Sequence, residues 1–489
     1  MKRFLSLLLA LCVVLTIAGC GTDNTQSKGK NGATVVDTYK GKFRAGFGRG
    51  DITPDESVPL SGYGNSDKRF SEEIIDMLYI DAFAVSDQDN NTLMFMCIDT
   101  VAISEADAKA VAAVVNSSTG IPEKNVYCIA THTHSAPDMA ENLVAKCGYL
   151  VEYKSKFFSG ARKAAVDAMN DRAPAEIYIG ETEATGISFV RHYISAAGYV
   201  STDNHDTRKS ADDPLVKHCS EVDPTLHFMK FKRQGKKDII YTNWRAHGQM
   251  TGGSKVYSVS SDWVGPFRDK FEKESGAYVI YLQGAAGNIN PKSNIAADNG
   301  KTDHREEGET LADYLLAALD NCKKVKSGKV KNTEKELELN INHTQDYLRS
   351  YAMLVSNKWN ETANFTESVA AGGTSEIISP YQARAIIRNA SLPKTQKFVF
   401  QVASIGDEIG FTFMPFEMFD TNGVWVEENS PYKYTMVQAY TNGLNGYLPS
   451  SFAFTYGSYE CDITYCQPGT AEAVSTELVN MLKTIKSSK

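Results

Sequence analysis

The spacing of apolar and polar positions changes repeatedly between the period of a strand and that of a helix. Short runs rich in β-branched and aromatic residues predict strands over residues 81–87, 92–100, 125–133, 175–182, 238–247, 277–287, 397–406, 408–416 and 434–443. Longer amphipathic segments predict helices over residues 104–118, 150–171, 261–275, 308–322 and 470–486. Because strands and helices interleave, we expect an α/β fold with mixed β-sheets flanked by helices.

The first residues have the pattern of an export signal. Lys2 and Arg3 precede an apolar run, and the ending "LTIAGC" resembles a bacterial lipobox. We therefore expect residues 1–19 to be a lipoprotein signal peptide and Cys20 to be lipidated, with an ordinary secretory signal as the alternative. Residues 20–42 are polar and predict a flexible tether, which would place the protein outside the cytoplasm on the bacterial cell membrane.

The rest of the chain, residues 43–489, is expected to form a single domain. Residues 345–392 within it are polar and helix-like, which predicts an insertion or a cap over a site. Loss of the signal would change the net charge from −8 to about −10, and this acidity argues against nucleic acid as a partner. The basic run 323–331 is predicted to be a solvated helix end and turn. Oligomeric state is not indicated.

The cysteines do not form a complete disulfide framework, because an odd number remains after the signal and Cys20 are set aside. Cys97 and Cys128 lie in apolar runs and are expected to be small core residues. Cys461 and Cys466 are close in sequence and could pair outside the cell. No Cys-x-x-Cys occurs, so a thiolate zinc site is not expected.

Five predicted strands end in a polar cluster just beyond the apolar run. Such ends carry the sites of many α/β proteins, because rigid strands there aim residues held on loops. The candidate residues at these ends are His132, His134, His247, Asn290, Glu417 and Tyr447. Two or three His or Glu ligands with one open position are what a catalytic zinc needs.

Each of these residues also has a purely structural interpretation. His132 and His134 would point to one face of a strand, where they could form an exposed ridge or bond to the backbone. His247 could be a packed core histidine, Glu417 a carboxylate at a helix start, and Tyr447 a loop aromatic. The pattern alone leaves both interpretations open.

Several segments, taken in order, resemble the zinc-dependent catalytic domain of the neutral (non-lysosomal) ceramidase family. They are "FRAGFGRGDITP", "LYIDAFAV", "THTHSAPD", "NWRAH", "SSDWVG", "QGAAGNINP", "IGDEIGFTFMPFEMF" and "NGYLPS". The resemblance extends from about Phe43 to Glu472 and is weakest over residues 345–392. "THTHSAPD" is the most specific of these segments.

The resemblance implies a zinc-dependent amidohydrolase that cleaves an N-acyl amide, ceramide-like or related, with zinc-activated water. It implies that the zinc ligands are His132, His247, Glu417 and Tyr447. His134 would face the substrate and stabilise charge on the carbonyl oxygen. Arg191 would lie near the scissile group, although it could instead be a surface cation.

Two departures from the family put the lipid substrate in doubt. Asn290 replaces a serine of the ceramide-cleaving members, and asparagine can hydrogen-bond but cannot act as a nucleophile. Lys292 replaces an asparagine in the same segment, and no C-terminal immunoglobulin-like domain is expected in this chain. The alternatives are therefore a zinc hydrolase of esters or lactones, or a non-catalytic lipid-anchored binding protein with a degenerate site.

Overall fold

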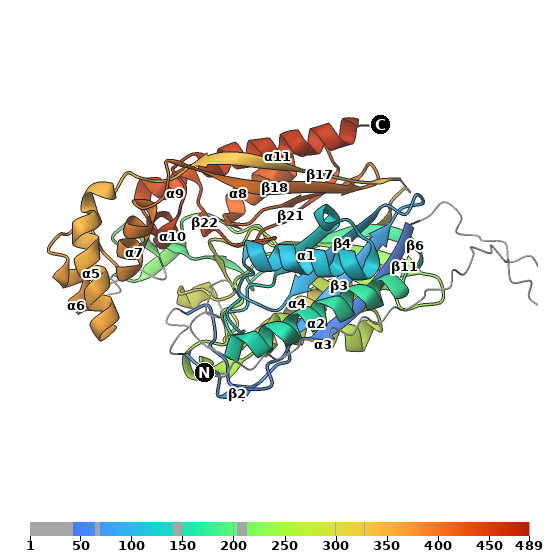
Figure 1. Ribbon diagram of the computed structural model, residues 1–489, viewed down its shortest axis with the longest axis horizontal. Coiled ribbons are helices and arrows are strands. Elements are labelled where there is room, and N and C mark those ends of the chain that lie inside the picture. Colours follow the sequence, from blue (N-terminus) through green and yellow to red (C-terminus); the bar gives the residue numbers. More distant parts are fainter. Residues whose placement is uncertain are drawn as a thin grey trace, which may run out of the picture. The chain divides into compact units, whose positions relative to one another are not determined.

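Two main β-sheets form the centre of the fold in the computed structural model (Figure 1). The structure describes residues 43–63, 69–139, 149–198, 200–202, 213–298, 300–326 and 328–488. Residues 41–489 form one compact unit. The predicted signal, the tether and Cys147 lie outside the described residues. None of the described helices is both long and apolar enough to cross a membrane.

The larger sheet is mixed and holds nine strands in the described residues, with the order β14-β12-β11-β6-β1-β3-β4-β5 and β16 paired to β6. Its strands are β1 (Phe43–Asp51), β3 (Tyr79–Ser86), β4 (Thr92–Ile98), β5 (Val126–Ala130), β6 (Ala173–Glu183), β11 (Thr225–Arg233), β12 (Ile239–Trp244), β14 (Tyr278–Gln283) and β16 (Lys323–Lys324). The second sheet has the order β17 (Val330–Asn340), β18 (Thr395–Ile405), β19 (Ile409–Phe413) and β21 (Tyr434–Gln438). This architecture confirms the predicted α/β fold with mixed sheets flanked by helices.

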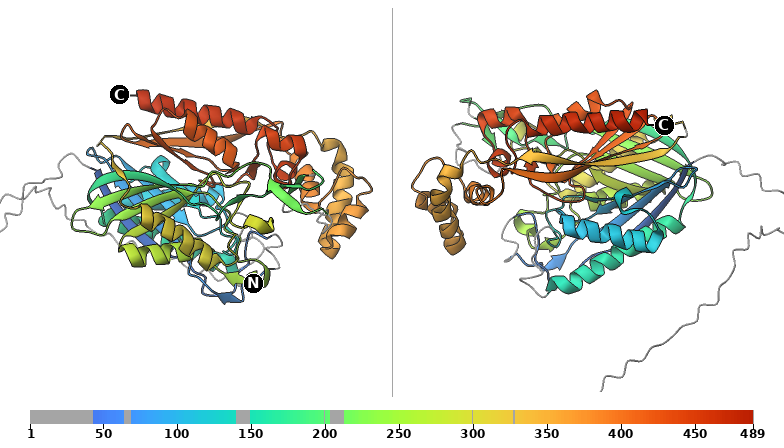
Figure 2. Two further views of the ribbon diagram at one scale, coloured as in Figure 1. Left: turned by 180° about the vertical axis from the view of Figure 1, so that it is seen from behind. Right: turned by 45° about the horizontal axis from the view of Figure 1, so that its top comes forward.

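Helices cover the outer face of each sheet, so the unit has four layers, helix–sheet–sheet–helix (Figures 1 and 2). The large sheet is covered by α1 (Glu105–Thr119), α2 (Tyr149–Asn170), α3 (Val264–Ser275) and α4 (His304–Ala318). The second sheet is covered by α8 (Asp420–Asn429) and α11 (Thr470–Ser487). Other short elements include β2 (Glu73–Ile74), β8 (His192–Ser195), β9 (Val200–Thr202), β10 (Leu215–His218), β13 (Ser258–Val259), α9 (Ser451–Tyr456) and α10 (Tyr459–Ile463).

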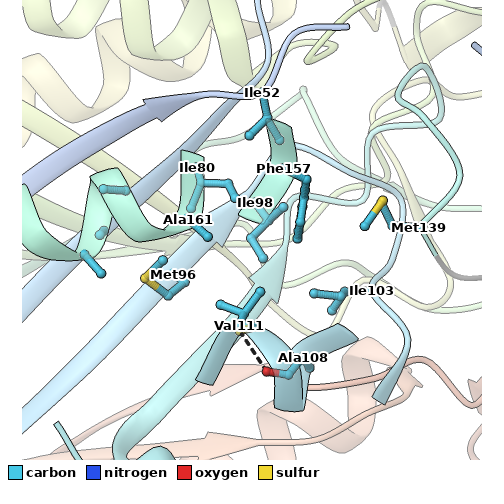
Figure 3. Close-up of a cluster of buried hydrophobic side chains, with 14 of the residues drawn as sticks. Ile52, Ile80, Met96, Ile98, Ile103, Ala108, Val111, Met139, Phe157 and Ala161 are labelled. Atoms are coloured by element: carbon cyan, nitrogen blue, oxygen red, sulfur yellow. Dashed lines mark hydrogen bonds between the residues drawn. The ribbon is translucent and has the colours of Figure 1, made fainter. Parts of the chain in front are cut away.

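Successive side chains of β3 and β4 point to opposite faces of the sheet, so these strands contribute to two hydrophobic cores. On β4, Met94, Met96 and Ile98 face α1 and α2, and Figure 3 shows this cluster. Phe95 and Cys97, the residues between them, face the second sheet. Both faces of these strands are therefore apolar, as expected for strands buried on two sides.

The glycines of "GFGRG" let α2 lie directly on β1. A Cβ atom at Gly46, Gly48 or Gly50 would come within 2.0–2.1 Å of a backbone carbonyl oxygen of α2. Phe47, between them, points to the opposite face and packs between the two sheets. This alternation fixes which face of β1 receives the helix.

Most predicted helices and strands are confirmed, although five predicted strands end three to five residues early, and two further predictions are wrong. The strand predicted over 125–133 ends at Ala130, because His132 has a left-handed backbone with φ of 64°. The basic run 323–331 contributes to β16 and β17 and is not a helix end, since its residues pair with β6 and β18. Cys461 and Cys466 are both free thiols, so they do not pair with each other.

The helix-like segment 345–392 is helical. It contains α5 (Arg349–Thr362), α6 (Phe365–Ala371) and α7 (Pro380–Asn389), which lie beside the end of the sheets in Figure 1. Leu348, Ala352, Val355 and Ile386 belong to a small core of its own. The segment is joined to the main body through α7 and α10, where the rings of Tyr381 and Tyr459 are 6.0 Å apart.

Candidate functional site

Three short backbone pairings bring the polar strand ends together. β20 (Glu417–Met418) and β22 (Tyr447–Leu448) are parallel, with Glu417 opposite Tyr447. β15 (Ile289–Asn290) and β7 (Phe189–Val190) are antiparallel, which places Asn290 beside the segment that leads into Arg191. A bridge between Thr133 and Gly248 joins the histidine pair to the segment that carries His247.

His132 and His247 are oriented by backbone carbonyl groups. His132 Nδ1 lies 2.7 Å from the carbonyl oxygen of Val101, and His247 Nδ1 lies 3.0 Å from that of Ile289. Because a carbonyl oxygen only accepts, both Nδ1 atoms donate, and Nε2 is the ring atom of each that can offer a lone pair to a metal. The same arrangement orients the histidine ligands of many metal sites.

Acceptor atoms converge at the centre of the site. Glu417 Oε2 lies 3.3 Å from His132 Nε2 and 3.4 Å from His247 Nε2, and His134 Nε2 lies 3.3 Å from His132 Nε2. Burial lowers the pKa of His247 to about 4, so this ring carries no proton on Nε2 at neutral pH. Converging lone pairs at such distances suit a bound cation.

The electrostatics of Glu417 and His134 follow from their burial and neighbours. Burial raises the pKa of Glu417, but the positive charge that His132 and His247 carry when protonated, together with their hydrogen bonds, lowers it below its usual value. The pKa of His134 is lowered well below its usual value by burial, and then by His132 and His247. At neutral pH Glu417 is therefore a carboxylate and His134 a neutral imidazole.

Arg191 lies at the side of the convergent group. It is 2 % exposed, so the alternative that it is a surface cation is wrong. Its Nη1 lies 3.3 Å from His247 Nε2 and 3.4 Å from Asn290 Oδ1. Its Nη2 donates to the hydroxyl oxygen of Tyr447 at 3.1 Å and to the carbonyl oxygen of Gly287 at 3.0 Å. The guanidinium group thus contacts His247 and Asn290 through Nη1 and Tyr447 through Nη2.

The structure brings all the predicted site residues into one buried site. They are His132, His134, His247, Glu417, Tyr447, Arg191 and Asn290, none more than 9 % exposed. The loop-aromatic interpretation of Tyr447 fails because its side chain faces this site.

Sequence reasoning missed three neighbours of these residues. Tyr440 donates to Glu417 Oε2 at 3.4 Å, and it follows the apolar run of β21, so the strand-end pattern could have found it. Glu460 and His192 lie behind Arg191. Glu460 follows no apolar run, and His192 was visible only as the neighbour of Arg191 in sequence.

The buried group of His132, His134 and His247 could hold a metal ion. Their ligand nitrogens all lie within 4.8 Å of one another. Two of the rings have their Nδ1 atoms bound to carbonyl groups, and a carboxylate lies against them. The residues present therefore fit a divalent metal that prefers nitrogen and oxygen ligands.

Comparison with solved structures gives the same fold. Neutral ceramidase from Pseudomonas aeruginosa matches with a TM-score of 0.68 and 17% sequence identity over 91% of this chain and 75% of that chain. A structure described as a ceramidase complexed with C2 matches with a TM-score of 0.65 and 15% identity, over 90% of this chain and 75% of that chain. A comparison with curated protein sequences finds no match.

The comparison with family models is decisive for the relationship. The model for the N-terminal part of neutral/alkaline non-lysosomal ceramidases matches residues 43–291, which is just over half of the chain. The match covers β1, both histidines of "THTH", Arg191, His247 and Asn290. This family and fold support a hydrolase that acts on amide bonds. The chain belongs to the neutral/alkaline non-lysosomal ceramidase family.

Proposed function

We propose that this protein is a zinc-dependent amidohydrolase that cleaves the N-acyl amide bond of a lipid-like substrate. The observation that carries the proposal is the convergence of His132 Nε2, His247 Nε2 and Glu417 Oε2, with separations of 3.3 Å and 3.4 Å to the carboxylate oxygen. Ligands about 2.0–2.1 Å from a tetrahedral zinc lie roughly 3.3–3.4 Å from one another. The two separations from the carboxylate oxygen match edges of such a tetrahedron.

Four residues would hold the metal: His132, His247, Glu417 and Tyr447. The pairing of Glu417 with Tyr447 across β20 and β22 supports the inclusion of the tyrosine. When bound, zinc would activate a water molecule as a nucleophile near neutral pH and polarise the substrate carbonyl group.

His134 is proposed to act on the substrate and not to hold the metal. Within the part of the chain that the structure describes, its buried Nδ1 has no hydrogen-bond partner, whereas both proposed histidine ligands have one. Ligating histidines almost always donate through the second ring nitrogen. A neutral His134 can donate an N–H hydrogen bond to the oxygen of the scissile carbonyl group. It is also the group proposed to take up the proton that the attacking water releases and to pass it to the leaving nitrogen.

Arg191 is proposed to stabilise the negative charge that develops on the same oxygen. Its Nη1 and Nη2 atoms face His247, Asn290 and Tyr447 from one side of the site. A well-placed donor in a buried site contributes about 3 kcal/mol to transition-state stabilisation. Asn290, which can both donate and accept, is proposed to orient the substrate by hydrogen bonds.

The proposed substrate class is an N-acyl amide with lipid character, ceramide-like or related. The family and the two ceramidase structures of the same fold support this class. Asn290 in the place of the family serine favours one other candidate, a binding protein with a degenerate site. Cys20 is proposed to anchor the protein to the membrane, which rests on the sequence pattern alone.

The test combines metal analysis with turnover. Purified protein should contain about one zinc per chain and should hydrolyse members of a panel of N-acyl amides of different chain length. Chelation should abolish turnover and added zinc should restore it. Chromogenic esters and lactones serve as the comparison panel. A zinc-loaded protein that cleaves esters but no amide would contradict the proposed bond specificity.

A further inference from the structure

A buried carboxylate lies behind Arg191, on the side away from the histidines. Glu460, on α10, is 1 % exposed and accepts a hydrogen bond from Arg191 Nε at 2.6 Å. The two residues are separated by 269 positions in the sequence. Glu460 contributes no atom to the group formed by His132, His247 and Glu417. Its contact with the site is the hydrogen bond from Arg191.

Glu460 is itself fixed by a second buried residue. Its Oε2 lies 2.9 Å from His192 Nε2, and His192 Nδ1 lies 2.8 Å from the hydroxyl oxygen of Tyr456. A carboxylate only accepts, so His192 donates to Glu460 through Nε2, while its Nδ1 makes a hydrogen bond with the hydroxyl group of Tyr456. Both oxygens of Glu460 are thus engaged, and its carboxylate plane is fixed.

The orientation of the two terminal nitrogens of Arg191 follows from its contact with Glu460. The guanidinium group is planar and rigid, so fixing Nε against Glu460 sets the directions of Nη1 and Nη2. These two nitrogens are the ones that face His247, Asn290 and Tyr447. The charge of Glu460 also compensates the buried arginine, since an unpaired buried charge is strongly unfavourable.

We infer that Glu460, held by His192, is a positioning residue that aims Arg191 at the reacting group. The role rests on the proposed amide hydrolysis. Glu460 neutralises Arg191 from behind while leaving both terminal nitrogens directed at the site. The inference predicts that loss of the carboxylate charge weakens transition-state stabilisation by Arg191 and leaves the proposed metal ligands in place.

The main variant is Glu460→Gln, which keeps the size of the side chain and removes its charge. Its kcat on the best N-acyl amide should fall about tenfold or more with KM changed less than about twofold, because an oxyanion donor acts mainly in the transition state. Zinc content should stay unchanged. Because Glu460 acts through Arg191, the Arg191→Lys/Glu460→Gln double variant should be no slower than Arg191→Lys alone.

The matched control is Asp81→Asn. Asp81 is also a buried carboxylate, 1 % exposed, and accepts from Arg49 Nε at 2.5 Å, yet it contacts none of the site residues named above. The Asp81→Asn substitution should lower thermal stability about as much as Glu460→Gln and leave kcat unchanged. Equal kcat losses in the two variants, or additive losses in the double variant, would overturn the inference.

A binding measurement separates this inference from the proposed function. Octanoate, a carboxylate of the kind an amide hydrolase releases, should bind the protein as purified, and calorimetry should show affinity about tenfold weaker in Glu460→Gln and in Arg191→Lys. This readout does not require turnover. If Glu460→Gln does not fold, Tyr456→Phe should lower kcat about threefold in the wild-type background and not in Arg191→Lys. Octanoate affinity unchanged by Glu460→Gln, or no octanoate binding by the wild type, would contradict the positioning role.

Discussion

Arg245 and Asp420 join the two chain segments that carry His247 and Glu417. Arg245 Nη1 lies 2.9 Å from Asp420 Oδ1, and each residue is 2 % exposed. Arg245 precedes His247 by two positions, and Asp420 follows Glu417 by three. A buried ion pair therefore connects two segments whose separation sets the distance between a proposed histidine ligand and a proposed carboxylate ligand.

Replacing Arg245 by methionine should destabilise the protein and weaken metal binding. Arg245 also contacts Glu427 at 3.1 Å and Asp223 at 3.0 Å, so its loss leaves the buried Asp420 and two partly buried carboxylates without their cation. The expected loss in the free energy of unfolding is about 3–5 kcal/mol, measured by chemical denaturation. The control is Lys163→Met, which breaks an exposed pair with Asp167 and should change stability by less than about 1 kcal/mol. Equal effects in the two variants would contradict the prediction.

The two histidines of "THTH" should behave differently when each is replaced by alanine. His132→Ala and His247→Ala should lose the bound zinc, because each removes a nitrogen whose ring is oriented by a carbonyl group. His134→Ala should keep the metal and lose most activity. Metal content by mass spectrometry and turnover on one amide substrate check both expectations. Loss of zinc from His134→Ala as complete as from His132→Ala would show that His134 is a ligand.

The metal-free protein should become less stable as the pH falls below about 6.5. Burial lowers the pKa of His247 to about 4, so the folded state stays neutral while the unfolded chain takes up a proton. The stability that this group contributes is complete above the unfolded value, about 6.5, and is lost as the pH falls towards 4. The loss is about 1.4 kcal/mol per pH unit in this interval, and His134, also lowered, adds to it.

Denaturation of chelator-treated protein at several pH values measures this effect. The useful quantity is the difference between wild type and His247→Gln, because groups that do not interact with His247 titrate alike in both. The wild type should show the steeper decline between pH 6.5 and pH 4.5. Parallel curves for the two proteins would mean that His247 is not buried neutral in the metal-free state.

How much of this molecule was predictable depended on whether a feature is local in sequence. His132, His247, Glu417 and Tyr447 could be found as candidates because each lies beyond the end of an apolar run. These runs form β5, β12, β19 and β21. β17 was missed because its charges, as in "KNTEKELEL", hide the alternation of a strand that is only partly buried. β1 was missed because glycines weaken its strand signal, although they are what allows α2 to approach.

The contacts that align the site could not be predicted in this way. Glu460 reaches Arg191 only because the folded chain places α10 beside Arg191 and His192, and nothing near Glu460 in the sequence indicates a partner. The left-handed backbone of His132 is equally invisible, since histidine rarely adopts φ of 64° without tertiary support. Such conformations are set by the packing of the whole site.

The lipid anchor is tested by Cys20→Ser in the full-length chain. The lipobox-like ending of the apolar segment predicts that this variant leaves the membrane fraction, because the substituted residue cannot carry a thioether-linked lipid. Fractionation followed by mass measurement of the intact protein checks the result. Unchanged membrane association, together with an unchanged mass apart from the substitution, would refute a lipidated Cys20.

Asn290→Ser is the most informative single change for the substrate, because it restores the residue of the ceramide-cleaving family members. Asn290 Oδ1 is 3.4 Å from Arg191 Nη1, so the side chain already takes part in the hydrogen bonding of the site. Metal-activated water would supply the nucleophile, and a side-chain hydroxyl is therefore not required for attack. We expect the wild type to cleave some N-acyl amide and ordinary long-chain ceramide poorly.

In the Asn290→Ser variant, ceramide turnover should rise or the preference among amides should shift, without loss of activity. Kinetics on a short-chain amide and on long-chain ceramide, measured in parallel for both proteins, give the ratio of kcat/KM that decides this. Asn290→Ala is the matched control, because it removes the amide without adding a hydroxyl group. If the zinc-loaded wild type and Asn290→Ser both fail on every amide, the degenerate binding-protein alternative becomes the better account.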